Sequence, residues 1–358
     1  MRKYRNRILA GFAIGFVIYL GLLLFADAEG LTDDLVAQIR IYPWLLIVPV
    51  ILQKFVSWFF RFLEWHYYLG VIGARDKISR FDSGILFVSG FTMAVSPGKV
   101  AEMLKTVILK TKTGVPIATS APVVIAERVV DGLAVIILSF LSLLAAGDQI
   151  NLGPYRPLIF LSTALLAAGL VAVQIRPLAY FGLDVIARLP LVGRLYDWLS
   201  GFYESSREIF KLKHIIPTTG FGMVASALDA VGFVIILYGF GIDVTWLLLL
   251  QSMVIVGLAS AIGALSGVPN GAGITEISVS AMLTIIVAPL NPVLTAGVAA
   301  AAVIEGFLHK WLRVLVGLLV ATIFRKRLFG VEVEAALVEM EHERQQGRVE
   351  LGTEVSGA

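Results

Sequence analysis

Residues 96–105 have the sequence SPGKVAEMLK and interrupt an apolar run that begins at position 84. Proline has no backbone N–H to donate and glycine weakens a helix, so the Pro-Gly pair ends a helix at this point. Charged residues follow directly. A broken helix within a membrane is tolerated only where protein or a water-filled cavity covers its free backbone groups. We therefore predict the floor of a polar cavity that accepts a charged head group, with the candidate binding residues Ser96, Pro97, Gly98, Lys99 and Glu102.

The composition is that of a polytopic membrane protein. Hydrophobic residues make up 58% of the 358 positions, charged residues 15%, and the mean hydropathy is +0.87. A soluble domain of ordinary composition has about 45–50% apolar and about 25% charged residues. There is no cysteine, and the four histidines are far apart in sequence. We expect an all-α membrane protein with neither a disulfide nor a thiolate or zinc site, and we expect no cofactor.

Apolar runs near or above the roughly 20 residues that cross a bilayer predict about six full transmembrane helices. These runs are residues 8–25, 43–63, 117–146, 158–173, 216–240 and 293–324. Basic residues at 2–7 and 325–327 predict a cytoplasmic N-terminus and a cytoplasmic C-terminus, and the acidic loop 26–42 is expected outside. We expect a multi-pass protein of the cell (inner, or cytoplasmic) membrane.

Two further segments predict broken, re-entrant helical hairpins. The run 84–95 is too short to span, and a second short helix continues to about residue 109 with basic residues at both ends. The later segment 246–288 is interrupted at 266–273, and its second helix is also short. That short helix favours a re-entrant hairpin, although a full crossing stays open. Interrupted segments of opposite orientation are typical of inverted repeats with a midplane site, which is our hypothesis here.

We expect a single transmembrane domain over residues 1–327, followed by a charged cytoplasmic tail at 328–358. Residues 177–214 mix apolar and basic side chains. This mixture predicts amphipathic helices at the cytoplasmic interface, with an ordinary solvated loop region as the alternative.

Ionisable residues within the apolar runs mark a candidate binding site, because charge at membrane depth is costly. Lys99 begins a helix, where free N–H groups favour an anion, and arginines supply bidentate phosphate contacts. Carboxylates would balance these cations when no substrate is bound. The alternative is that pairs such as Arg128–Asp131 and Glu305–His309 only hold helices together. The candidates beyond the first break are Glu127, Arg128, Asp131, Asn270, Gly271, Gly273, Glu276, Glu305, His309 and Arg313.

The spacing of these residues predicts which of them lie on the same face of a helix. Arg128 and Asp131 are three apart and are expected to lie side by side on one helix. Glu305, His309 and Arg313 recur every four residues, which predicts one shared stripe. Among the lysines after the first break, Lys110 and Lys112 are expected to anchor the helix at the lipid interface. Lys105 could belong to either the interface or the cavity.

Sequence motifs for catalysis are not found. The chain has no phosphate-binding Gly-x-x-x-x-Gly-Lys-Ser/Thr loop, no His-Glu-x-x-His and no Gly-x-Ser-x-Gly. Its longest cytoplasmic stretches are shorter than the 50 or so residues that a domain usually needs. We expect a non-enzymatic protein, with an intramembrane enzyme as the alternative.

The motifs resemble a known family. Residues 96–105, KTKTGV at 110–115 and AERVVDGL at 126–133 are similar in order and spacing to the lysylphosphatidylglycerol synthase transmembrane region (flippase-like domain) family. VPNGAGITE at 268–276 is similar to its second Pro-Gly-Gly…Glu element, with Asn270 where a glycine is common and Thr275 where an arginine often precedes the glutamate. The resemblance covers roughly residues 7–327.

The resemblance implies a lipid flippase- or scramblase-like transporter. The soluble aminoacyltransferase domain found in the best-known members is lacking, so we do not expect lipid synthesis. The implied partner is a membrane lipid, either an anionic phospholipid, an aminoacylated lipid or a polyprenyl-phosphate-linked lipid, moved downhill or with an ion gradient. Nucleic acid is not expected. A homo-oligomer or a partner glycosyltransferase or lipid synthase is possible, and the alternative function is an intramembrane enzyme or accessory subunit in lipid or envelope-glycan assembly.

Overall fold

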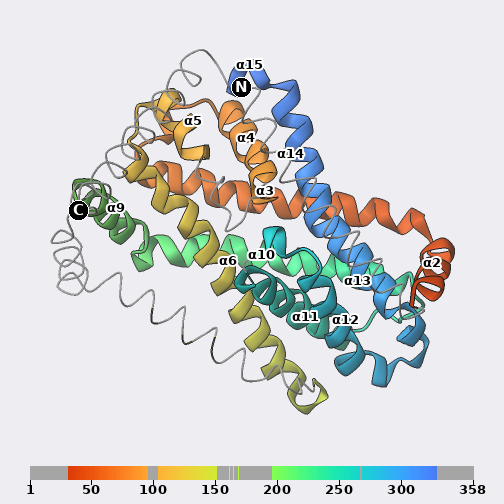
Figure 1. Cartoon of the computed structure of the whole chain (residues 1–358). Helices are drawn as coiled ribbons and strands as arrows, with labels where there is room; N and C mark the ends of the chain where they lie inside the picture. Colours follow the sequence, from red (N-terminus) through yellow and green to blue (C-terminus); the bar gives the residue numbers. More distant parts are fainter. Residues whose placement is uncertain are drawn as a thin grey trace, which may run out of the picture.

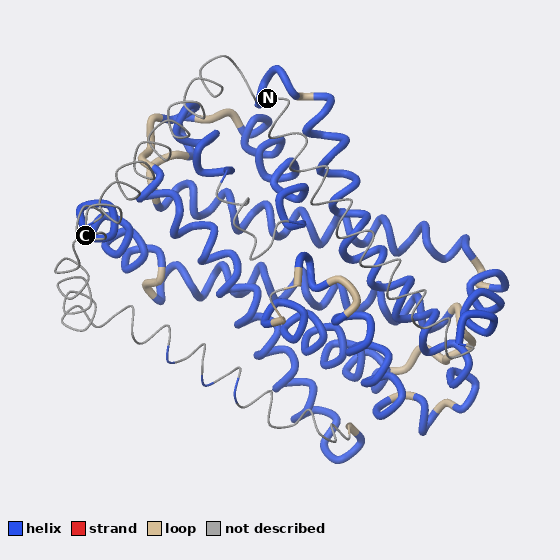
Figure 2. The backbone as a smooth tube through the Cα atoms, viewed as in Figure 1, coloured by secondary structure: helices blue, strands red, loops and turns tan. Residues whose placement is uncertain are grey.

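The computed structural model describes residues 31–95, 104–150, 196–266 and 268–328, with three isolated positions at 161, 164 and 168. Within these ranges the chain forms helices and no strands (Figures 1 and 2). The helices are α2 (Leu31–Ile41), α3 (Ile47–Val71), α4 (Arg80–Ser89), α5 (Leu104–Thr113), α6 (Ile117–Ala146), α9 (Tyr196–Ile209), α10 (Leu212–Tyr238), α11 (Trp246–Leu265), α12 (Ile274–Ile286), α13 (Val298–Gly306), α14 (Leu312–Ile323) and α15 (Arg325–Leu328).

Five of the described helical segments are long and apolar enough to cross a membrane, which confirms the all-helical, multi-span prediction. They are Trp44–Val71, Ile117–Ala146, Leu212–Tyr238, Trp246–Ala264 and Val298–Ile323. Large apolar side chains such as Leu45, Leu144 and Ile216 are at least two-thirds exposed on or beside them. Exposed apolar surface of this kind is compatible with lipid and not with water. The predicted spans 8–25 and 158–173 lie outside the described residues.

The first broken segment differs in detail from the expected helix at 84–95. Helix α4 begins earlier, at Arg80, because the Ser79 side chain accepts a hydrogen bond from the backbone N–H of Asp82 at 3.0 Å. It ends at Ser89, and the 3-10 helix η3 (Gly90–Val95) continues toward the first break, residues 96–98. Helix α5 resumes after the break with 10 residues. Both helices are too short to cross a bilayer.

The second broken segment has unequal arms. Helix α11 has 20 residues and is long enough to span, whereas α12 has 13. The 3-10 helix η8 (Pro269–Gly271) lies in the second break, residues 266–273. The 3-10 helices η3 and η8 pack against each other. The segment that enters the first break therefore meets the second break inside the fold.

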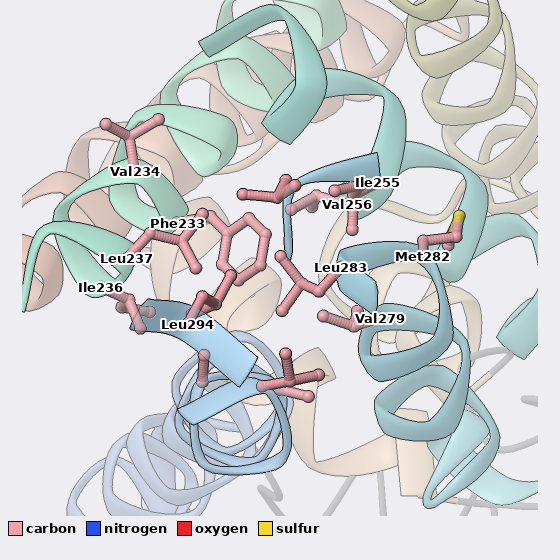
Figure 3. Packing of buried hydrophobic residues seen from close by; sticks show 14 of the residues in the cluster. Phe233, Val234, Ile236, Leu237, Ile255, Val256, Val279, Met282, Leu283 and Leu294 are labelled. Atoms are coloured by element: carbon pink, nitrogen blue, oxygen red, sulfur yellow. The ribbon is translucent and has the colours of Figure 1, made fainter. Parts of the chain in front are cut away.

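Two hydrophobic clusters form the core. One joins parts of α10, α11, α12 and α13, and includes Phe233, Leu283 and Leu294 (Figure 3). The other joins parts of α3, α4, α5 and α6. On α3, Val50 belongs to the first cluster and Trp58 to the second. Lys54 lies between them along the helix, so a charged residue marks the boundary of the two cores.

Helices α3 and α10 run along each other, and α6 packs on α10, α11 and α9 (Figure 1). Helix α9 falls within the predicted amphipathic region, whose residues 177–195 lie outside the described ranges, as do 1–30 and 329–358. The described helices thus bring α3, α6, α10 and α14 around the polar residues that the sequence singled out.

Candidate functional site

A cavity with an empty volume of about 450 Å³, including its open mouth, lies beside the segments that flank the first break. Its walls come from η3 and five helices, which are α3, α4, α5, α6 and α14. The lining residues are Arg61, Glu64, Phe87, Gly90, Phe91, Lys105, Glu127, Arg128, Asp131 and Arg313. Four of these side chains are cationic and three are anionic, which gives a formal net charge of +1 if all are ionised. The cavity therefore favours an anion.

Lys105 belongs to the cavity and not to the lipid interface. Its ammonium group donates to Oε2 of Glu127 at 2.8 Å, and it lies 4.4 Å from the centre of the Trp65 ring. The aliphatic part of Lys105 runs past Gly90, where an added Cβ would lie 2.5 Å from Cδ. Glycine at position 90 therefore leaves the space that the lysine side chain occupies on its way to Glu127.

Glu64 is a second buried carboxylate in the cavity wall. The residue is 2% exposed, and its Oε1 has no hydrogen-bond partner within the described ranges. Burying an unpaired polar atom costs free energy. A proton, a water molecule or a hydrogen-bond donor of a ligand would therefore be stabilised next to this oxygen.

Arg61 and Arg128 meet at Asp131. Arg61 Nη1 contacts Oδ1 of this carboxylate, and Arg128 Nη1 lies 3.4 Å from Oδ2. The expected pair between Arg128 and Asp131 therefore forms. Arg61 also reaches Oδ2 of Asp229 at 3.4 Å. Arg61 thus links α6 to α10.

Asp229 belongs to a charged cluster centred on Lys54, which is 1% exposed. The Lys54 ammonium group lies 3.2 Å from Oδ1 of Asp229, 3.2 Å from Nδ1 of His309 and 3.9 Å from Oε1 of Glu305. Buried charges persist when they are paired in this way. We call Lys54, Asp229, Glu305 and His309 the Lys54 cluster.

A π-helical turn at Phe307–Trp311 joins α13 to α14. Glu305 and His309 lie together, with Oε1 and Nδ1 3.5 Å apart. Arg313 lines the cavity, 5.5 Å from the Phe91 ring centre. One end of the predicted stripe therefore lies in the Lys54 cluster and the other end lies at the cavity.

The second break is held by Lys310, which is 4% exposed. Its ammonium group donates to the carbonyl oxygen of Gly271 at 3.0 Å and to both carboxylate oxygens of Glu276, at 3.1 and 3.0 Å. Oε2 of Glu276 also accepts from the backbone N–H of Gly273 at 2.8 Å. One ion pair therefore fixes the start of α12 to the helix that carries His309.

The backbone of this break is left-handed at three positions, with φ of 55° at Asn270, 60° at Gly271 and 80° at Gly273. Asparagine adopts this region more readily than most residues other than glycine. Asn270 therefore keeps the backbone conformation that a glycine would allow.

The candidate residues from the sequence divide into separate groups. Glu127, Arg128, Asp131 and Arg313 line the cavity, Glu305 and His309 lie in the Lys54 cluster, and Asn270, Gly271, Gly273 and Glu276 form the second break. Ser96, Pro97, Gly98, Lys99 and Glu102 lie outside the described residues.

Sequence analysis missed four charged residues of the site, Lys54, Arg61, Glu64 and Lys310. Each is a charged residue in an apolar run, which is the signal that identified the other candidates. Among the described residues no group of His, Asp and Glu side chains could hold a metal ion.

Helical spans, the contact between η3 and η8, and charges buried along the spans define a multi-pass membrane protein with an internal polar site. A sequence model of the lysylphosphatidylglycerol synthase TM region matches residues 8–325, so the chain belongs to that family. No curated protein and no solved structure matches the chain.

Proposed function

We propose that the protein is a lipid flippase- or scramblase-like transporter. It moves an anionic or polyprenyl-phosphate-linked lipid between leaflets, with the head group passing through the cavity at the first break. The observation that carries the proposal is the cavity itself, where Arg61, Lys105, Arg128 and Arg313 surround a space within the membrane domain. Ionisable groups at membrane depth are costly and typically line a substrate path.

The four cations are not equivalent. Lys105 and Arg61 are each held by a carboxylate at close range. Arg128 lies farther from its carboxylate, at 3.4 Å, and its side chain is 38% exposed. A guanidinium group binds phosphate through two parallel hydrogen bonds. Arg128, which lines the cavity and is partly exposed, is therefore the side chain best placed to bind a lipid phosphate, and Arg313 in the same lining supplies a second contact.

The meeting of η3 and η8 supports a path to both leaflets. In this proposal both broken segments are re-entrant and approach the midplane from opposite sides, with the termini cytoplasmic. Irregular backbone at membrane depth is tolerated where it lines a cavity. The lipid tails would stay in the bilayer while the head group crosses between the breaks.

The test is a proteoliposome assay with fluorescent phosphatidylglycerol, phosphatidylcholine and polyprenyl phosphate, with and without a pH gradient. We compare the wild type with Arg128→Gln and with the control Arg75→Gln, whose side chain is half exposed and lies outside the cavity. Loss of a charged hydrogen bond of about 1.5–3 kcal/mol predicts at least a roughly tenfold slower transfer in Arg128→Gln. The control should match the wild type.

Two results would contradict the proposal. If no lipid moves under either condition, transport is excluded and the search turns to a partner enzyme. If a labelled lipid is chemically converted without any partner, the protein is an intramembrane enzyme.

A further inference from the structure

Three polar groups of the Lys54 cluster form a triangle inside the fold. Nζ of Lys54, Nδ1 of His309 and Oε1 of Glu305 are separated by 3.2, 3.5 and 3.9 Å. Lys54 and Glu305 are 1% and 2% exposed. The triangle does not line the cavity. It therefore needs an explanation other than direct contact with a head group.

The donors and acceptors of this triangle determine where its hydrogen atoms lie. An ammonium group only donates, so Nδ1 of His309 accepts from Lys54 and the neutral ring carries its proton on Nε2. Nδ1 then also faces Oε1 of Glu305, which is an acceptor without a hydrogen-bond partner among the described residues. Nδ1 has a single lone pair, so a proton bound between it and Oε1, 3.5 Å away, replaces the hydrogen bond from Lys54. That proton would supply the missing hydrogen bond whether it resides on the carboxylate or on the ring.

We propose that Glu305 and His309 form a proton-binding site that controls the head-group cavity. One proton is taken from water and bound between Oε1 and Nδ1, and no other bond is made or broken. The charged groups around this pair come from five elements. They are Lys54 and Arg61 on α3, Asp229 on α10, Glu276 on α12, and Lys310 and Arg313 on the π turn and α14.

A chain of ion pairs connects this site to the cavity. Lys54 contacts Asp229, Asp229 contacts Arg61, Arg61 contacts Asp131, and Asp131 contacts Arg128. A proton on the pair removes either a negative charge or an acceptor from Lys54. Lys54 then binds Asp229 more strongly, which weakens the hold of Asp229 on Arg61. Arg61 in turn binds Asp131 more strongly, which weakens the contact between Asp131 and Arg128 and lets Arg128 bind a phosphate more readily.

The effect on the cavity rests on the proposed function, whereas proton binding itself does not. We therefore measure proton binding directly, by infrared difference spectroscopy of the full-length protein in nanodiscs between pH about 5 and about 8, where histidine sites titrate. The wild type should show a carboxylic acid band or a histidinium band that grows at low pH. Glu305→Gln should show a smaller signal because it cannot bind the shared proton, and the control Asp76→Asn, whose carboxylate is 96% exposed, should match the wild type. Absence of both bands in the wild type, or a signal of equal size in Glu305→Gln, would overturn the proposal.

Folding of each variant is checked by size exclusion and helix content. If Glu305→Gln does not fold, His309→Gln serves instead. It should move the midpoint of the band, because it removes the facing ring nitrogen, and an unchanged midpoint would overturn the pairing.

A second experiment tests the connection to the cavity. Lipid transfer is measured in proteoliposomes with and without an imposed pH gradient, and the ratio of the two rates is compared between variants. A wild-type ratio of about fivefold or more, falling to about one in Glu305→Gln, is expected for coupled sites. Equal ratios in wild type and variant would refute coupling. If the infrared band behaves as expected but no lipid moves at all, the proposed function fails while the proton site stands.

Discussion

Nζ of Lys105 lies 2.8 Å from Oε2 of Glu127, and both residues are about 95% buried. The pair connects α5, the helix that follows the first break, to the long helix α6. A helix of 10 residues is not stable alone in water and depends on its packing. The pair therefore holds one wall of the cavity in place and contributes one cation and one anion to its lining.

Breaking this pair should be costly. Lys105→Met or Glu127→Leu leaves one buried charge without its partner, which destabilises by about 3–5 kcal/mol. The double variant replaces both charges with apolar groups and should recover much of that loss. The free energy of unfolding, measured in detergent with denaturant, gives all three values.

The exposed pair Lys211–Glu208 provides the control, since its side chains are 38% and 43% exposed. Glu208→Gln should cost no more than about 1 kcal/mol. If the buried variants cost no more than this control, the Lys105–Glu127 contact does not stabilise the cavity wall.

Gly90→Ala should displace Lys105 from Glu127. The new methyl group would lie 2.5 Å from Cδ of Lys105, so the lysine side chain must move. Gly220→Ala on α10 is the matched control, because a Cβ there meets nothing within 4 Å. We expect a lower melting temperature and slower lipid transfer for Gly90→Ala. The control should be neutral or stabilised by up to about 1 kcal/mol. Similar behaviour of the two variants would show that Lys105 adapts to the methyl group.

Sequence reasoning located the helical architecture and the helix breaks more reliably than the partners of each charge. Hydropathy alone indicates the long spans, and proline and glycine indicate the breaks. The partner of Glu127 is Lys105, 22 positions away, and that of Lys54 is Asp229, 175 positions away. Such pairs depend on how helices pack, which local spacing does not encode. The π turn at Phe307–Trp311 was not predicted either, because no residue pattern there indicates an extra residue per turn.

Lys310→Met should loosen the second break. The variant leaves the buried Glu276 carboxylate without its ammonium partner and Gly271 without a donor to its carbonyl. We expect faster maleimide labelling of a cysteine at Ser266, a position with an ordinary helical backbone, when Lys310→Met is added. The control is Lys326→Met in α15, which lies outside this network. An unchanged labelling rate would mean that the break is held by its backbone alone.

The two breaks should be accessible from opposite sides of the membrane if the hairpins are inverted repeats. The chain has no cysteine, so a single introduced thiol reports without further substitutions. We place cysteine at Ser96 and, separately, at Asn270, and treat right-side-out and inside-out vesicles with a membrane-impermeant maleimide. Opposite sidedness is expected because the first hairpin is predicted to start and end inside and the second outside.

Cysteine at position 270 must adopt a left-handed backbone, at a cost of about 1–2 kcal/mol. Ser266→Cys therefore serves as a second reporter of the same break, since its φ is −65°. Labelling of both breaks from the same side, by either reporter, would refute the inverted repeat. In that case the contact between η3 and η8 would bring together two segments that enter from one leaflet, and the cavity would open to that leaflet alone.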